Sequence, residues 1–274
     1  MDLQLLLWIP VIAWSLQKVL EKDLLGATHH RDFAKLAVFF NFIIVLPLIF
    51  FVEVPSLPSL LITALTALMN IASSFFLYRG FQDDDISRVA PFEQFYLILT
   101  VLLAYLFLGE RLLPLQYLGI FAAVSGGILI SLDRGFLSVP QFLKDNRAAG
   151  IVLVSAFLSG VSVLFNKTAL NWGTTAISLL LFRRLFAAVL IAPFVVKIPR
   201  VRSWPKFLLT RILSSYGLLI LLFVVSKQMV STTIPILAFL PLGVAFFSRN
   251  LLKEKIGWWR IAGIIIIIGG YALV

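Results

Sequence analysis

The residues best placed to do chemistry are charged side chains that interrupt long apolar stretches. Arg183 and Arg184 lie near the middle of one such stretch. A charged side chain at the centre of a bilayer costs about 2.5–3.5 kcal/mol on insertion scales, so these arginines need a reason to be there. Because adjacent helical positions lie about 100° apart, we expect only one of the two to face the protein interior. That one would either bind an anionic substrate group or pair with protein groups and tie helices together.

Glu93 is the one carboxylate well inside a predicted span, and it allows two interpretations. In a cavity, it could couple transport to protons or balance a cationic substrate. It also follows Pro91 at the start of a helix, where a carboxylate is favoured by the helix dipole. The position slightly favours this second role, that of an N-terminal cap.

Polar and aromatic side chains recur on several apolar stretches. Asn70, Ser73 and Ser74 share one helix face, and Ser155, Ser159 and Ser162 do so to within one residue. Such faces either bind neighbouring helices or line a wet cavity. We predict a substrate site formed by Trp14, Gln17, Asn70, Ser74, Tyr78, Glu93, Gln94, Ser159, Ser162, Asn166, Arg184 and Tyr216.

Other chemistry finds little support in the residue pattern. Asp83 to Asp85 and His29-His30 are interpreted as solvated loops, because no further ligand lies near them in sequence. There is no cysteine, no nucleotide-binding loop, no metalloprotease spacing and no serine-triad context. The net charge of +10 comes from short basic clusters without interleaved aromatics, which argues against nucleic acid as a partner. We therefore expect no catalysis, no cofactor and no metal.

The elements that must position these residues are membrane-spanning helices. The chain is 61% hydrophobic and 13% charged, against about 45–50% and about 25% in soluble domains. A span needs about 20 mostly apolar residues. The sequence predicts ten, at 3–20, 34–52, 58–78, 89–108, 115–132, 149–170, 175–196, 207–226, 232–248 and 256–274.

An internal repeat organises these spans. A shift of 144 residues aligns 89–130 with 233–274 without a gap, and Ser15-x6-Lys22 resembles Gly160-x6-Lys167 with one residue of slip. The most specific matches are Pro91 with Pro235, Glu110 with Glu254, Gly119 with Gly263 and Gly126 with Gly270. We predict an all-α integral membrane protein with two five-helix repeats, 1–132 and 149–274. Because five is odd, the second repeat is inverted.

Basic residues test the span count independently. Of the 23 lysines and arginines, 18 lie in or beside alternate connections, whereas the remaining connections hold only Arg111, Lys167 and Lys227. The positive-inside rule then places both termini outside the cytoplasm.

The chain resembles a known family at this point. Ser87 to Pro91, Leu108 to Arg111, Gly119 and Gly126-Gly127 resemble the EamA-type half of the drug/metabolite transporter superfamily. The second half matches through Pro235, Leu252 to Lys255, Gly263 and Gly270, and Phe182-x-Arg184 resembles a further motif. There are departures: Asn41 stands where arginine is common, Glu254 lacks a preceding glycine, and family members often keep both termini in the cytoplasm.

Several other residues receive structural predictions. Glu110 and Glu254 are expected to form ion pairs in turns beside Arg111 and Lys255. The small-residue face Gly119-x3-Ala123-x3-Gly127 is expected to pack within the bundle or between protomers, with Gly263 and Gly270 in the partner span. Four cations are expected to snorkel at helix ends. These are Lys18, Lys22, Lys35 and Arg211, of which Lys22, with its mate Lys167, is also a candidate gate residue.

The resemblance implies a multi-pass cell-membrane transporter of a small metabolite or drug, with the ten helices around a central cavity lined by both repeats. Such a protein would work by alternating access as an exporter or exchanger. Its expected partners are the solute, the bilayer and a proton or exchanged substrate, and both monomer and homodimer are compatible. Pro91, Pro235 and Pro241 could serve as bending points. The alternatives are a flippase for a lipid-linked sugar and a non-transporting membrane binding or assembly protein. The sequence does not name the substrate, the direction or the coupling ion.

Overall fold

The structure is a computed structural model that describes residues 3–83, 92–131, 147–195, 201–253, 258–271 and 273. These residues form helices and their connections, with no strand among them. Pro91, the Asp84-Asp85 pair and Glu254 lie outside the described residues. The helices are α1 (Trp8–Leu25), α2 (His30–Val45), α3 (Leu57–Asp83), α5 (Phe95–Leu108), α6 (Pro114–Ser131), α8 (Arg147–Asn171), α9 (Ala176–Ile191), α10 (Trp204–Lys227), α11 (Val230–Thr233), α12 (Leu240–Leu252) and α13 (Trp258–Tyr271).

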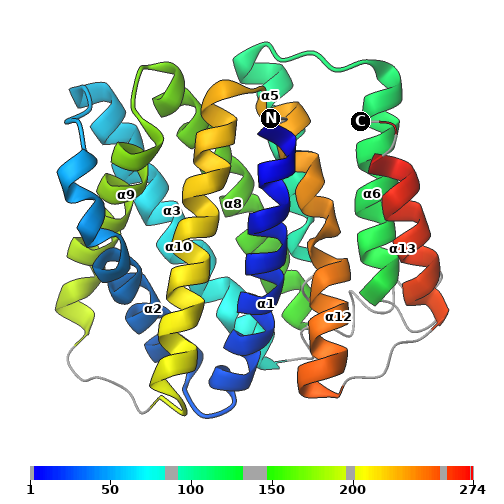
Figure 1. Cartoon of the computed structure of the whole chain (residues 1–274), viewed down its shortest axis with the longest axis horizontal. Helices are drawn as coiled ribbons and strands as arrows, with labels where there is room; N and C mark the ends of the chain where they lie inside the picture. Colours follow the sequence, from blue (N-terminus) through cyan, green and yellow to red (C-terminus); the bar gives the residue numbers. More distant parts are fainter. Residues whose placement is uncertain are drawn as a thin grey trace.

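The axes of the long helices are roughly aligned, with the chain running up some helices and down others, and the helices form a bundle (Figure 1). The N- and C-termini lie at the same end, which we call the terminal end; the other is the distal end. Helix α1 starts at the terminal end and α10 at the distal end, and these two pack side by side (Figure 1). Helices α6 and α13 pair at one side of the molecule, whereas α2, α3 and α9 gather at the other.

Seven helical segments in the described residues are long and apolar enough to cross a membrane. They are Leu3–Leu25, His30–Phe51, Leu57–Asp83, Arg147–Asn171, Ala176–Phe194, Trp204–Lys227 and Val230–Leu252, and two shorter apolar helices are Phe95–Leu108 and Ile261–Tyr271. Large apolar side chains such as Phe50, Leu106 and Ile265 point outward, 87%, 68% and 64% exposed. Such an apolar outer surface is suited to contact with lipid.

The segment from 230 to 252 is broken, although the sequence predicted one span at 232–248. It begins as α11, tightens into a 3-10 helix, η5 (Ile234–Phe239), and continues as α12. Pro235 and Pro241 occupy the first turns of the last two pieces. Proline has no N–H and its ring crowds the preceding turn, so each interrupts the regular hydrogen-bond ladder.

Helices α6 and α13 approach closely because glycines face each other. A Cβ placed on Gly126 would lie 2.6 Å from the Gly263 oxygen, and one on Gly270 would lie 2.6 Å from the Gly119 oxygen. These are backbone atoms, which cannot move aside cheaply. The predicted small-residue contact is therefore confirmed as packing within the bundle, and it includes Gly126; Gly127 instead faces Pro241.

Charged side chains bind the ends of neighbouring helices. The Glu110 carboxylate accepts the N–H groups of Val230 (3.0 Å) and Ser231 (2.8 Å) at the start of α11. The expected Arg111 ion pair is thus replaced by a helix cap, because the first N–H groups of a helix lack internal partners and attract a carboxylate.

Two lysines bind backbone oxygens at the C-terminal ends of helices. Lys167 donates to the oxygens of Val225 (2.8 Å) and Gln228 (2.9 Å), where α10 ends. Lys22 donates to the Phe81 oxygen near the end of α3. Each lysine supplies donors to carbonyls that the helix leaves unpaired. Lys22 therefore binds a helix end, and the gate role suggested for Lys22 and Lys167 stays a prediction.

Candidate functional site

A cavity of about 200 Å³ lies inside the bundle. Its walls come from α1, α2, α3, α5, α8, α9, α10 and α12, together with η5 and residue 93. Ten predicted site residues line it: Trp14, Gln17, Asn70, Ser74, Tyr78, Glu93, Ser159, Ser162, Asn166 and Arg184.

Two predicted site residues do not line this cavity. Gln94 is buried elsewhere, and its side-chain oxygen has no hydrogen-bond partner in the described residues. Tyr216 is 40% exposed on α10. Gly217 follows it and faces α1, where an added Cβ would lie 2.6 Å from the Trp14 indole nitrogen. The helix therefore turns Gly217 toward its neighbour and Tyr216 away from the cavity.

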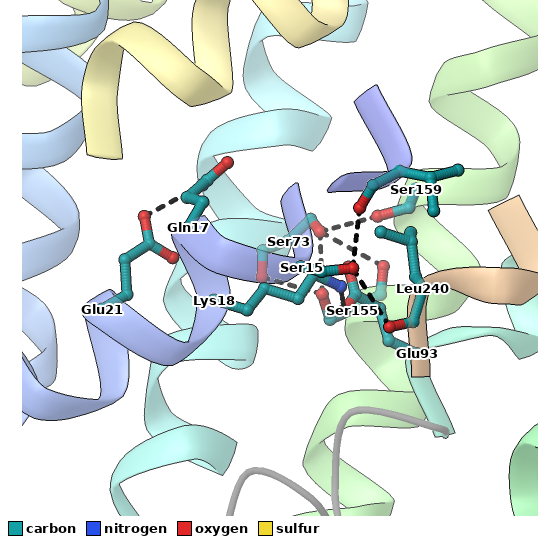
Figure 2. A network of polar contacts seen from close by, with 10 residues as sticks. Ser15, Gln17, Lys18, Glu21, Ser73, Glu93, Ser155, Ser159 and Leu240 are labelled. Atoms are coloured by element: carbon teal, nitrogen blue, oxygen red, sulfur yellow. Dashed lines mark hydrogen bonds and ion pairs between the residues drawn. The ribbon is translucent and has the colours of Figure 1, made fainter. Parts of the chain in front are cut away.

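Lys18 and Glu93 form an ion pair in the wall of the cavity. Figure 2 shows the Lys18 side chain directed from α1 at the Glu93 carboxylate. Their side chains are only 9% and 13% exposed. The expectation that Lys18 snorkels to a helix end is wrong, because α1 continues to Leu25 and places Lys18 inside the bundle. The carboxylate of Glu93 faces lysine, so the cap interpretation does not describe its contact.

A second buried ion pair joins Glu21 of α1 to Arg211 of α10. The Glu21 carboxylate also accepts hydrogen bonds from Tyr78 Oη (3.1 Å) and Gln17 Nε2 (3.0 Å). Arg211 is fully buried, with its guanidinium 5.3 Å from the Phe207 ring centroid. The prediction that Arg211 snorkels is therefore wrong as well. Charged groups this deep are retained when each is paired and hydrogen-bonded.

Arg183 and Arg184 both line the cavity and both are buried. We expected only one to face inward. The α9 helix is covered on most of its circumference, by α2, α3, α8 and α10, so two adjacent long side chains reach the same interior space. Arg184 donates weakly to Asn70 Oδ1 (3.4 Å) and Ser214 Oγ (3.5 Å). Neither arginine forms an ion pair with a carboxylate in the described part of the chain.

Several polar atoms in or near the cavity lack protein partners within the described residues. They include the side-chain oxygens of Asn41 and Asn166 and the Nε atoms of Arg183 and Arg184. All four residues line the cavity. Buried polar groups are nearly always hydrogen-bonded, to protein or to water. These atoms are therefore the groups most available to a solute or to water.

The serine faces divide between packing and lining. Ser73 lies within hydrogen-bond distance of Ser155 Oγ (2.8 Å) and Ser159 Oγ (2.9 Å), so it joins α3 to α8 (Figure 2). Ser15 donates to the Leu240 oxygen (3.2 Å) and joins α1 to α12. Ser74 and Ser162, in contrast, line the cavity and form no side-chain hydrogen bond within the described residues, which separates the two uses of serine faces.

The predicted substrate site left out several lining residues, among them Lys18, Glu21, Asn41, Tyr96, Arg183 and Ser214. Ser214 carries a usable signal, because the 144-residue shift relates it to Asn70. Glu21 was missed because the apolar stretch ends at Leu20 while the helix continues. The apolar remainder of the wall consists of Leu77, Val163, Leu218, Leu221, Leu222, Val225, Ile234 and Leu240.

The acidic and histidine clusters do different work. Asp83 pairs with Arg79 at 3.8 Å, one helical turn away. His29 caps α2 through the Arg31 N–H, and the His30 ring lies 2.8 Å from Gln82 Oε1. Within the described residues, no group of three possible metal ligands occurs.

Comparison with known proteins gives a consistent result. A crystal structure superposes on the chain with a TM-score of 0.77 at 14% identity, covering 100% of this chain and 98% of that one. At this identity the likeness shows the fold alone. No curated protein matches the chain. A family model described as the EamA-like transporter family matches twice, at residues 3–132 and 146–274. Since these matches cover nearly the whole sequence, the chain is a multi-pass membrane protein that belongs to the EamA-like transporter family.

Proposed function

We propose that this protein is a secondary active transporter that carries a small solute across the membrane by alternating access. One observation carries the proposal: a single polar and charged cavity is walled by helices from before residue 132 and after residue 146. Its lining combines unpaired polar atoms with ion pairs between different helices. A soluble binding protein would not need an apolar outer surface. A polar, charged cavity inside a bundle with an apolar outer surface therefore suits a path for a solute through lipid.

The two parts of the chain act, in this proposal, as inverted five-helix repeats over 1–132 and 149–274, with ten spans in total. Lys22 and Lys167, related by 145 residues, bind Phe81 and Val225, which are related by 144. These equivalent contacts lie near opposite ends of the bundle, because α1 and α8 run in opposite directions (Figure 1). Inverted repeats around a midplane site support alternating access by rocking of one half against the other.

The charges support an orientation with both termini outside the cytoplasm. The distal end would then face the cytoplasm, since basic residues beside these connections, such as Arg202 and Lys206 near the start of α10, lie there. A reporter that is active only in the cytoplasm, fused after Val274, should give no signal. A strong signal would reverse the orientation without changing the fold.

The cavity size favours a metabolite over larger cargo. Sites for drug-sized ligands occupy about 300–1,000 Å³, and this cavity holds about 200 Å³. A lipid-linked sugar would need a larger chamber open to lipid. The flippase alternative therefore has less support than transport of a small metabolite, driven by a proton gradient or by exchange.

The natural absence of cysteine allows a direct test. Gln17→Cys and Ser162→Cys place single thiols at lining positions related by the 145-residue shift. In sealed vesicles, membrane-impermeant maleimide should label each thiol from one side only, and a transported solute should change the two labelling rates in opposite directions. Ser226→Cys, at the surface of α10, serves as the control and should not respond.

Two results would contradict alternating access. Labelling of either thiol from both sides of the membrane at once would indicate a channel. Solute binding with no change in either labelling rate, and no uptake into proteoliposomes, would support the binding-protein alternative.

A further inference from the structure

The cavity contains more buried positive charge than negative. Two carboxylates line it, those of Glu21 and Glu93, and each is paired with one cation, Arg211 and Lys18 respectively. Arg183 and Arg184 remain, and both are at least 95% buried. Within the described ranges no carboxylate balances them. Among the described residues the site thus holds two guanidinium groups in excess.

Arg184 lies between the two proposed halves. Its Nη1 faces Asn70 and its Nη2 faces Ser214, two residues related by the 144-residue shift. A group held by equivalent positions of both halves lies near the axis that relates them. In inverted-repeat transporters this is the region where the solute binds.

The hydrogen bonds of these arginines are incomplete for a purely structural role. A guanidinium has five N–H donors in a planar fork. Arg184 uses two of them at 3.4 and 3.5 Å, the long limit for a hydrogen bond. Its Nε and that of Arg183 have no partner in the described structure. An arginine that only ties helices together would be expected to donate at about 2.9 Å to well-placed acceptors.

We propose that the transported solute is a small organic anion whose carboxylate or phosphate group binds Arg183 and Arg184. This inference rests on the proposed transport function and names its substrate class. A planar oxyanion accepts two parallel N–H bonds from one guanidinium, which is the geometry that arginine offers and lysine does not. The anion also supplies the negative charge that the cavity lacks.

The remaining lining describes the body of the solute. Trp14 and Tyr96 provide aromatic surface, and Leu218 and Leu222 provide aliphatic surface. Asn41 and Asn166 keep side-chain oxygens free for donors. A compact organic acid or phosphate ester with an apolar body matches this lining and the volume of about 200 Å³.

The test uses purified full-length protein and matched small probes. Benzoate and benzamide share size and shape but differ in charge, and phenyl phosphate and phenol distinguish phosphate from carboxylate. Benzylamine serves as the cation. Binding is measured by thermal stabilisation and titration calorimetry, and counterflow is measured in proteoliposomes. We expect benzoate or phenyl phosphate to stabilise the wild type at millimolar concentration, with benzamide, phenol and benzylamine without effect.

Variants locate the binding group. Arg184→Gln should weaken anion binding about tenfold or more, as loss of charge-assisted hydrogen bonds does. Arg184→Lys keeps the charge but loses the fork and should fall between wild type and Arg184→Gln. Arg31→Gln is the matched control, since Arg31 is exposed on α2 and away from the cavity lining. It should bind as the wild type does.

The outcomes separate this inference from the proposed function. Counterflow of benzamide or benzylamine by wild type, unchanged in Arg184→Gln, would support transport and overturn the anionic substrate. Anion binding that depends on Arg184 without any counterflow would support the anion site and overturn transport. Wild type that shows no stabilisation by either anion overturns the inference, whether or not the variants fold.

Discussion

The two ends of the cavity use charged residues in different ways. Toward the distal end, where Lys22 also binds a backbone oxygen, two ion pairs join side chains: Glu21 with Arg211, and Lys18 with Glu93. At the terminal end, Lys167 and Glu110 bind backbone groups at helix ends. The residues equivalent to Lys18, Glu21 and Glu93 by the repeat are the uncharged Val163, Asn166 and Leu237.

This difference indicates at which end opening of the cavity costs more free energy. Separating a buried ion pair leaves two charges without partners, which is costly unless water enters. A lysine that leaves helix-end carbonyls exposes only neutral groups, and those can be solvated. The two ends of the cavity can therefore differ in the free-energy cost of opening although the two halves have similar backbones. We expect the end with the ion pairs to be the one that responds to bound ions or solute.

Breaking the Glu21–Arg211 pair should give the largest effect. Arg211→Met leaves a buried carboxylate with only Tyr78 and Gln17 as donors, and a loss of about 3–5 kcal/mol in unfolding free energy is expected. The double variant Glu21→Leu/Arg211→Met removes both charges and should recover most of that loss. Thermal unfolding in detergent measures both. If the loss of unfolding free energy in the double variant equals the sum of the losses in the two single variants, the two residues are not coupled.

Giving the first half the residues of the second would test the next pair. Lys18→Val and Glu93→Leu copy Val163 and Leu237. Each single variant should lose about 1–3 kcal/mol, less than Arg211→Met because the pair is slightly exposed. The double variant should be nearly as stable as wild type. A Gln17→Cys thiol added to this double variant should also react faster with maleimide from the distal side. An unchanged labelling rate would contradict a role of the ion pair in closing the cavity.

The backbone-bound lysines should give a smaller and more equal effect. Lys22→Met and Lys167→Met each remove donors to helix-end carbonyls, with an expected loss of about 1–2 kcal/mol. Lys35→Met on α2 is the control, because its contact with Asp32 is at 3.5 Å and exposed. It should change stability by less than about 0.5 kcal/mol. A loss at Lys167 as large as that at Arg211 would contradict the comparison.

The smallest effect concerns one backbone position that the halves share. Gly109 and Lys253, related by the 144-residue shift, both end a helix in the left-handed conformation, with φ of 68° and 59°. Glycine adopts this conformation without steric cost, whereas lysine does not. Lys253→Gly should stabilise the protein by about 0.5–1 kcal/mol, and Gly109→Ala should destabilise it by about 1 kcal/mol. Unfolding midpoints of the two variants, measured side by side, check both signs.

Apolar length and repeat spacing were enough to predict the helical class, the motif resemblance predicted the family, and polar residues on shared helix faces predicted ten of the residues that line the cavity. The reason is local: a helix in lipid must satisfy its own backbone, so apolar stretches and repeated glycines indicate helices and their close contacts. The same reasoning found Asn70 and Ser159, because polar residues that share a helix face stand out against an apolar background.

The apolar stretches predict that the chain is built from helices, whereas the charge pairs depend on how those helices pack. Lys18 joins Glu93 across 75 residues, and Arg211 joins Glu21 across 190. Their fate depends on which helices lie side by side and on how far α1 extends beyond its apolar stretch. Likewise, both Arg183 and Arg184 reach the cavity because four helices surround α9. The electrostatic energy of a charged side chain depends on every group around it, and the chain brings those groups together only when it folds.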